Sequence, residues 1–232
     1  YSVGKGTANT NGVVAIPYYW MGKKVTAIDS SAFSNCTTMT GIVIPNGVTI
    51  IGDQAFYHCD ALASVTIPPN VTTLYAASFQ YCGALTSVVI PPGVTTIGNQ
   101  VFAYATNLIS VTIPNTVTTM GDWVFGYCTS LASITLPPAL TTIGASAFRG
   151  MNILTSLMIP ATVTSIGTGA FAECTVLNLL TVNPLTPPFA GADLFLTSPA
   201  IVANSVRVPA GSVSAYQVAA GWSAYSAFIG SQ

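Results

Sequence analysis

The side chains best suited to acid–base chemistry lie around His58, the only histidine of the 232-residue chain. Asp53 and Asp60 are close to it in sequence, and a histidine oriented by a carboxylate is the base of many hydrolases. His58 is the second residue after Phe56. Equivalent positions in related segments hold chemically unrelated residues: Asn35, Tyr81, Tyr104, Tyr127, Gly150 and Glu173. A position that accepts all of these is typical of a surface, so the sequence predicts no catalytic role for His58.

The remaining charged residues are few and scattered. The six acids lie in different segments, so neither a carboxylate pair for glycoside hydrolysis nor a calcium cage is indicated. We therefore predict no enzyme, no metal site and no cofactor. Charged residues make up 5% of the chain and its net charge is −1, which argues against nucleic acid or anionic lipid as a partner. Lys23 and Lys24 are interpreted as a solvated turn, and no apolar run approaches the ~20 residues of a membrane span.

The five cysteines share one position, three residues after a phenylalanine: Cys36, Cys59, Cys82, Cys128 and Cys174. Two other segments have Ala105 and Met151 at this position, which is what a buried apolar position accepts. The pattern favours thiols buried in the core over metal ligands. One disulfide between neighbouring segments, joining Cys59 to Cys36 or to Cys82, stays open as an alternative.

These positions recur because the chain repeats itself every 23 residues. Phenylalanine marks the same place in seven copies: Phe33, Phe56, Phe79, Phe102, Phe125, Phe148 and Phe171. A period in the twenties is typical of a solenoid, in which each coil buries its apolar face against its neighbours. The aligned copies follow L-x-x-V-x-I-P-x-x-V-T-x-I-G-x-x-A-F-x-x-C. We therefore expect the phenylalanine rings to line up as one internal column.

Each part of this unit has its own local preference. Val65 and Ile67 alternate with Ser64 and Thr66, which indicates a half-buried strand that Pro68 ends. The V-T-x-I piece predicts a second short extended segment. The glycine that follows it, at positions 52, 98, 121, 144 and 167, predicts a turn with positive φ. The A-F-x-x-C piece predicts a single helical or 3₁₀ turn.

The ends of the repeat array differ from its middle, and we expect a single solenoid domain over residues 1–232. Residues 206–229 predict one strand, a helix over 211–220 and another near 222–229, which together would cover the open end of the sheet and the core. The predicted domain has three parts: a divergent first repeat with a short insertion (1–28), regular repeats (29–182), and an irregular last repeat with a helical cap (183–232).

The repeat unit resembles the BspA-like (Treponema pallidum type) leucine-rich repeat, L-x-x-I-x-I-P-x-x-V-x-x-I-G-x-x-A-F-x-x-C, over residues 13–182. The resemblance implies a leucine-rich-repeat solenoid of α/β type, a horseshoe or arc whose parallel sheet lines the concave side, with short helical or 3₁₀ turns. It also implies adhesion or partner binding, through that sheet and its flanks, by a secreted or surface-displayed protein. Ordinary leucine-rich repeats carry an asparagine ladder after the strand, and here that position varies: Gly47, Asn70, Gly93, Thr116, Ala139 and Thr162.

Two sets of side chains are candidate binding surfaces. The first is a row of aromatic residues on successive coils, about 5 Å apart: His58, Tyr81, Tyr104 and Tyr127, with Trp123 close by. Such rings either stack on one another and stiffen the solenoid, or meet a sugar face or another protein, and the sequence leaves both open. The second is a hydroxyl array on the outward face of the strands, with Val43, Val89 and Met158 interspersed: Ser64, Thr66, Ser110, Thr112, Ser133 and Thr135.

These features support two functions. One is a non-catalytic interaction protein, secreted or displayed on a cell surface, that adheres to a protein or a glycan. The alternative is a structural subunit of a homopolymeric filament, sheath or virion appendage. So little charge leaves a surface that other copies of the chain can cover. In neither case do we expect nucleic acid as a partner or a segment that spans a membrane.

Overall fold

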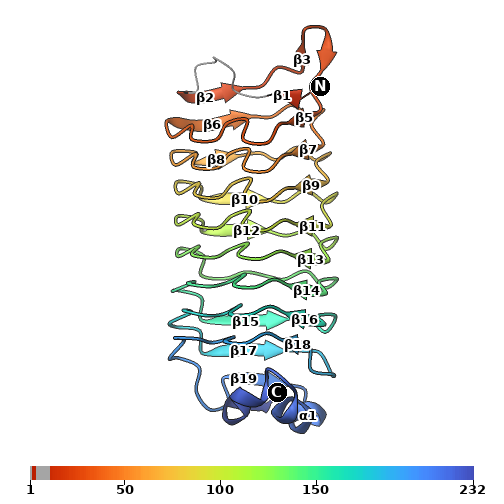
Figure 1. Ribbon diagram of the computed structural model, residues 1–232, viewed down its shortest axis with the longest axis vertical. Helices are drawn as coiled ribbons and strands as arrows, with labels where there is room; N and C mark the ends of the chain where they lie inside the picture. Colours follow the sequence, from red (N-terminus) through yellow and green to blue (C-terminus); the bar gives the residue numbers. More distant parts are fainter. Residues whose placement is uncertain (1, 4–10) are drawn as a thin grey trace.

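The computed structural model describes residues 2–3 and 11–232, which wind into coils stacked along one long axis (Figure 1). The first coils lie at one end of the stack and the helical C-terminal segment lies at the other. Two series of parallel strands run along the stack, and the chain passes from one series to the other within each coil. The predicted solenoid is confirmed.

The V-T-x-I pieces form one uninterrupted parallel sheet. Each strand pairs with the equivalent residues of the next coil, as Thr96 does with Thr119 and Ile97 with Met120. The nine strands in spatial order are β1 (Ser2–Val3), β5 (Ala27–Ile28), β7 (Ile50–Ile51), β9 (Thr73–Leu74), β11 (Thr96–Ile97), β13 (Thr119–Met120), β14 (Thr142–Ile143), β16 (Ser165–Ile166) and β18 (Phe189–Ala190).

The L-x-x-V-x-I segments form three separate parallel sheets rather than one. The strands are β2 (Gly12–Ala15), β6 (Met39–Val43) and β8 (Ser64–Val65) in the first sheet, β10 (Ser87–Val89) and β12 (Ser110–Thr112) in the second, and β15 (Ser156–Ile159), β17 (Leu179–Val182), β19 (Val206–Val208) and β20 (Ile229–Ser231) in the third. Residues 131–136 form no strand, so the predicted strand around Ser133 and Thr135 is wrong. The rings of Phe125 and Phe148 are 6.2 Å apart, the largest spacing in their column, although the backbones of the two coils stay hydrogen-bonded beside them, as Phe125 N–H is to the Ala147 carbonyl.

The A-F-x-x-C segments form turns and not helices. The N–H of Cys59 donates to the carbonyl of Phe56, as in a 3₁₀ turn, but His58 between them has a φ of 54°. A positive φ at the third residue is the mark of a type II turn and ends any helix. The N–H of His58 donates instead to the carbonyl of Gln80 on the next coil. The predicted helical turn is thus replaced by a turn that hydrogen-bonds its neighbour.

The repeated glycine serves close packing and not a turn with positive φ, which corrects the prediction. Gly52 and its equivalents do not have a positive φ. The residue with a positive φ comes two positions later in each coil, and in this coil it is Gln54. A Cβ added at Gly144 would lie 2.3 Å from the carbonyl carbon of Gly121 on the preceding coil. Because any larger residue would force the two backbones apart, glycine is what allows the coils to stack at this corner.

The phenylalanine rings form the predicted internal column. Their centroids lie 5.1–6.2 Å apart and successive planes differ by at most 20°. The column also includes Phe195, which the constant 23-residue spacing did not indicate. All of these rings are buried, in an apolar core that extends from Ile16 to Ile229.

The C-terminal segment closes the stack as predicted, although its α-helix is shorter than residues 211–220. Tyr216 and Trp222 are buried against each other, with centroids 5.2 Å apart. The Tyr216 hydroxyl donates to the Pro184 carbonyl and the Trp222 Nε1–H to the Pro188 carbonyl, each at 2.8 Å. The helical elements are η1 (Ala210–Ser212), α1 (Val213–Val218) and η2 (Ser223–Phe228).

The short insertion of the first repeat is an antiparallel hairpin of β3 (Tyr19–Trp20) and β4 (Lys23–Lys24), which projects from the N-terminal end of the stack (Figure 1). Lys23 and Lys24 are exposed, as predicted, but they form strand β4 and not the predicted turn, which lies at Met21 and Gly22. None of the helices in residues 2–3 and 11–232 has the length and apolarity that crossing a bilayer requires.

Candidate binding surfaces

The aromatic row is positioned by the type II turns. Tyr81, Tyr104 and Tyr127 have φ values of 61°, 62° and 57°, close to that of His58. The N–H of Tyr81 donates to the Ala103 carbonyl on the next coil, and each equivalent N–H does the same. Because left-handed backbone and inter-coil hydrogen bonds recur at the same place, the side chains leave every coil in the same direction.

The rings of this row stack face to face. Centroid distances are 4.3 Å for His58–Tyr81, 4.6 Å for Tyr81–Tyr104 and 4.9 Å for Tyr104–Tyr127, with interplanar angles of 8°, 13° and 16°. Tyr57 adds edge contacts to His58 and Tyr81. Self-stacking, one of the two interpretations of the row, is therefore confirmed. The faces between the rings are occupied, so a ligand would meet ring edges and hydroxyl groups. Binding by this row stays a prediction.

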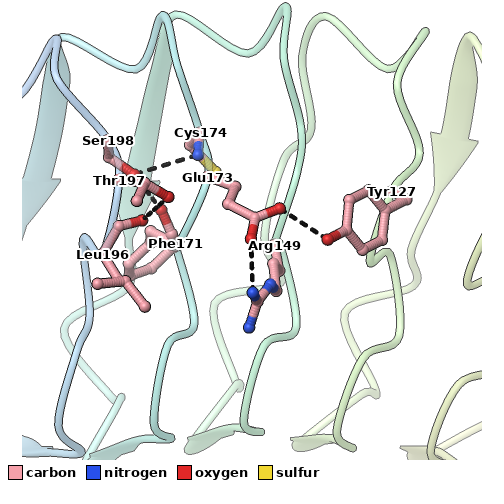
Figure 2. Close-up of polar contacts among 8 residues, drawn as sticks. All are labelled: Tyr127, Arg149, Phe171, Glu173, Cys174, Leu196, Thr197 and Ser198. Atoms are coloured by element: carbon pink, nitrogen blue, oxygen red, sulfur yellow. Dashed lines mark hydrogen bonds and ion pairs between the residues drawn. The ribbon is translucent and has the colours of Figure 1, made fainter.

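Tyr127 ends the row in a polar cluster, which Figure 2 shows. Its hydroxyl donates to Glu173 Oε2 at 2.7 Å, and Arg149 Nη2 is 2.5 Å from Glu173 Oε1. Gly150 makes this reach possible, since a Cβ there would lie 2.4 Å from Tyr127 Cδ1. The Arg149 guanidinium lies 5.4 Å from the centre of the Trp123 ring, which adds a cation–π contact.

The cluster shifts the proton affinities of its members. Hydrogen bonds, first from Tyr127 and then from Arg149, hold the pKa of the Glu173 carboxyl below its usual range. The hydrogen bond to Glu173 and then burial raise the pKa of Tyr127. The sequence places Glu173 at the position that tyrosines occupy in other coils, but it did not predict the hydrogen bond from Tyr127 to Glu173 or the ion pair with Arg149. The signal was the interruption of the row by Gly150, which brings Tyr127 and Glu173 together.

His58 does not assemble a catalytic site. Its Nδ1 lies 3.1 Å from Asp60 Oδ1, as the sequence proximity indicates. Asp53 is elsewhere engaged, because its Oδ1 accepts the N–H of Ala76 on the next coil. Among the described residues, no hydroxyl or thiol is hydrogen-bonded to His58, and no group of three metal-ligating side chains comes together.

The cysteine side chains belong to the core. All five are buried and none forms a disulfide, so the interpretation as core thiols is confirmed and the alternative of one inter-coil disulfide is wrong. The Sγ of Cys128 donates to the carbonyl of Phe102 at 3.2 Å, and Cys59, Cys82 and Cys174 make the equivalent contact. Burial raises the pKa of Cys128 to about 12, which keeps this thiol protonated and unreactive.

The hydroxyl array faces solvent, as predicted. Val65 and Ile67 point into the core while Ser64 and Thr66 are exposed, and the same alternation recurs along the stack. One column consists of serines only: Ser64, Ser87, Ser110, Ser133 and Ser156. The neighbouring column mixes threonine with apolar residues: Val43, Thr66, Val89, Thr112, Thr135 and Met158. We call these two exposed columns the hydroxyl face; it carries no charged residue.

A groove of about 440 Å³ opens on the hydroxyl face where its sheet is interrupted. Thr135 and Met158 lie in its wall, together with Ile134 and Leu136 of the segment that forms no strand. No lining residue is charged. The structure therefore brings part of the predicted array into a concave site. The aromatic row lies on the A-F-x-x-C turns and the hydroxyl face on the L-x-x-V-x-I segments, so the two surfaces belong to different parts of each coil.

Comparison with known proteins agrees with the repeat pattern and the fold. The family model described as "BspA type Leucine rich repeat region" matches six copies, over residues 16–128 and 95–189. A leucine-rich repeat protein of T. pallidum is 25% identical, with a TM-score of 0.56 over 75% of this chain and 73% of that chain. One from Bacteroides ovatus is 25% identical, with a TM-score of 0.51 over 87% of this chain and 64% of that chain.

A leucine-rich cell surface protein of Faecalibacterium prausnitzii shares the fold at 18% identity, with a TM-score of 0.52 over 96% of this chain and 87% of that chain. No curated protein matches the chain at a significant level. Proteins with these repeats are generally non-catalytic interaction or surface proteins. The family match covers most of the chain, which therefore belongs to the BspA-type leucine-rich repeat family.

Proposed function

We propose that this chain is a non-catalytic interaction protein, secreted or displayed on a cell surface, that adheres to a protein or a glycan through its hydroxyl face. The observation that carries the proposal is the uncharged groove whose wall includes Thr135 and Met158 of that face. Ligand sites are typically concave, mostly apolar and provided with a few polar groups, which describes this groove. The cell-surface name of the F. prausnitzii protein supports the same location for this chain.

The chemistry of the hydroxyl face defines its ligand. Serine hydroxyls accept and donate hydrogen bonds without a charge, while Val89 and Met158 offer exposed apolar area, 63% and 60% exposed. A ligand with few charges and many hydroxyl or amide groups can hydrogen-bond to the serines and still pack against the exposed apolar side chains. The ring edges and hydroxyl groups of Tyr81 and Tyr104 offer the ligand a second uncharged contact on the flank of the solenoid.

A charge placed in the groove tests this proposal. Thr135→Glu would bury a carboxylate at the contact and weaken adhesion at least tenfold, because an unpaired charge is costly to desolvate. Thr95→Glu is the matched control, since Thr95 is an exposed threonine outside the groove. Adhesion is measured on glycan arrays and immobilised extracellular-matrix proteins. Equal effects of the two variants would remove the groove from the binding surface.

A second function, a structural subunit of a homopolymeric filament, sheath or virion appendage, is favoured by one observation. Only 5% of the residues are charged, so little electrostatic repulsion keeps copies apart. Light scattering on the same two variants separates the functions. A wild-type polymer that Thr135→Glu dissolves supports the subunit, whereas a monomer at all protein concentrations supports adhesion.

A further inference from the structure

The hairpin β3–β4 stands apart from the repeats at the N-terminal end of the stack (Figure 1). Its turn has positive φ at both central residues, 48° at Met21 and 74° at Gly22, as in a type I′ turn. Asparagine, aspartate and glycine are the residues that favour the first of these positions. A methionine at this position is strained, and it does not favour the turn that the hairpin needs.

The strained turn presents an apolar tip. Tyr18, Tyr19, Trp20 and Met21 are consecutive and are 44%, 60%, 47% and 84% exposed. Single apolar residues are normal on a surface, but four in a row at a projecting end form a patch of the kind that marks an interaction site. Tyrosine and tryptophan are amphipathic, with a polar tip on an apolar ring, and so favour a boundary between water and a non-polar phase.

The same hairpin concentrates positive charge. Lys23 and Lys24 are two of the five basic residues in the chain, and neither forms an ion pair with an acid among the described residues. The ammonium of Lys24 lies 5.2 Å from the centre of the Tyr18 ring, and its stem covers Gly47. Lys23 is the cross-strand partner of Trp20, so the two side chains share one face of the hairpin.

We propose that this hairpin docks the protein peripherally on a lipid surface that carries anionic headgroups. Met21 and Trp20 enter the boundary between headgroups and acyl chains, Tyr19 lies at the level of the headgroups, and the lysines meet the phosphates. Aromatic residues gather at this depth in membrane proteins, and juxtamembrane lysines are attracted to anionic leaflets.

The net charge of −1, from which the sequence argued against anionic lipid, does not oppose this docking. Charges further apart than about 8 Å are screened at physiological ionic strength, so a membrane senses the charge of the hairpin and not that of the whole chain. The inference goes beyond the proposed adhesion. Docking at one end of the stack leaves the hydroxyl face and the aromatic row exposed along its length.

Vesicle co-sedimentation of the full chain tests the proposal, with vesicles of phosphatidylcholine alone and of phosphatidylcholine with phosphatidylserine. We expect binding only to the second kind. Lys23→Gln should weaken it about fivefold, and Trp20→Ser with Met21→Ser should abolish it. The matched controls are Arg207→Gln and Val218→Ser, an exposed cation and an exposed apolar residue at the C-terminal end, which should bind as wild type.

Brominated lipid identifies the inserted residue, because it quenches only a tryptophan that reaches the acyl chains. Wild type should be quenched and Trp20→Phe should not, since Trp222 is buried in the C-terminal cap and Trp123 lies on the flank. Equal binding to both kinds of vesicle, or equal loss in the hairpin and control variants, would overturn the proposal. So would retention on heparin without binding to vesicles, which would identify an anionic glycan instead.

Discussion

Two stacks of aromatic rings follow the same repeat, one inside the solenoid and one at its surface. The inner column of phenylalanines has centroid spacings of 5.1–6.2 Å, and the outer aromatic row has spacings of 4.3–4.9 Å. Both have nearly parallel planes. The common cause is the register between coils, which places equivalent residues directly above one another. Stacking alone is therefore no sign of a binding site.

The two stacks differ in what their positions tolerate. The inner position holds phenylalanine in every regular repeat, because it is enclosed and its volume is fixed by the coils on either side. The outer position is constrained by its positive φ and by solvent, so Asn35, Gly150 and Glu173 occupy it as well as the aromatic residues. The inner stack supplies stability, and the outer one is free to vary with function.

The largest expected effect tests the inner stack. Phe102→Ala removes a fully buried ring with stacked neighbours on both sides and should lower the free energy of unfolding by about 3–5 kcal/mol. Urea denaturation followed by circular dichroism measures the change. Phe102→Leu is the control, because it keeps most of the volume and should lose much less. A loss from Phe102→Ala no greater than that from Tyr104→Ala would erase the distinction between the stacks.

The inner column illustrates what the sequence predicts well. Phe102 and its equivalents recur at a fixed interval. When coils of equal length stack, such residues lie directly above one another and are buried together as one internal column. The period thus predicts solenoid, core and thiol positions together. It could not predict the break at Ser133 and Thr135, because that segment has the same alternating pattern as its neighbours. The pairing of this strand depends on its position relative to the coils on either side, which the pattern within one repeat does not encode.

Candidate sites were less predictable for a related reason. The aromatic row was visible as a repeated position, but its link to Arg149 depends on the space above Gly150, which no periodic pattern encodes. The hairpin tip at Trp20 and Met21 lies in the insertion, where the repeat gives no guidance. Met21 also occupies a turn position that sequence rules reserve for asparagine, aspartate or glycine. Departures from the repeat are thus where function has to be sought in three dimensions.

A smaller effect is expected from the outer stack. Tyr104→Ala removes two stacking contacts, with Tyr81 and Tyr127, each worth about 0.5–1.5 kcal/mol in proteins and less where solvent reaches the rings. We expect the free energy of unfolding to fall by about 1–2 kcal/mol. Tyr104→Gly should recover part of this loss, because glycine accepts the φ of 62° more readily than alanine does. If the glycine variant is less stable than the alanine variant, the left-handed backbone is not what constrains this position.

The smallest expected effect lies at the charged end of the outer row and depends on pH. The pKa of folded Glu173 is lowered by hydrogen bonds from Tyr127 and then Arg149, so the folded state favours the ionised carboxylate. The resulting stabilisation is fully present above the ordinary glutamate pKa of about 4.3 and is lost as the pH falls through the lower pKa of the folded state. Because about a third of the side chain is exposed, it should not exceed about 1 kcal/mol.

The difference in stability between wild type and Glu173→Gln isolates this contribution. Glutamine keeps the size of the side chain, and the other acids contribute equally to both proteins. The difference should be constant near neutral pH, shrink in acid below the ordinary glutamate pKa, and weaken with added salt. A difference that grows in acid would mean that Arg149 and Tyr127 do not stabilise the carboxylate. The same titration on Phe102→Ala should show no such dependence, since the inner stack has no group that gains or loses a proton.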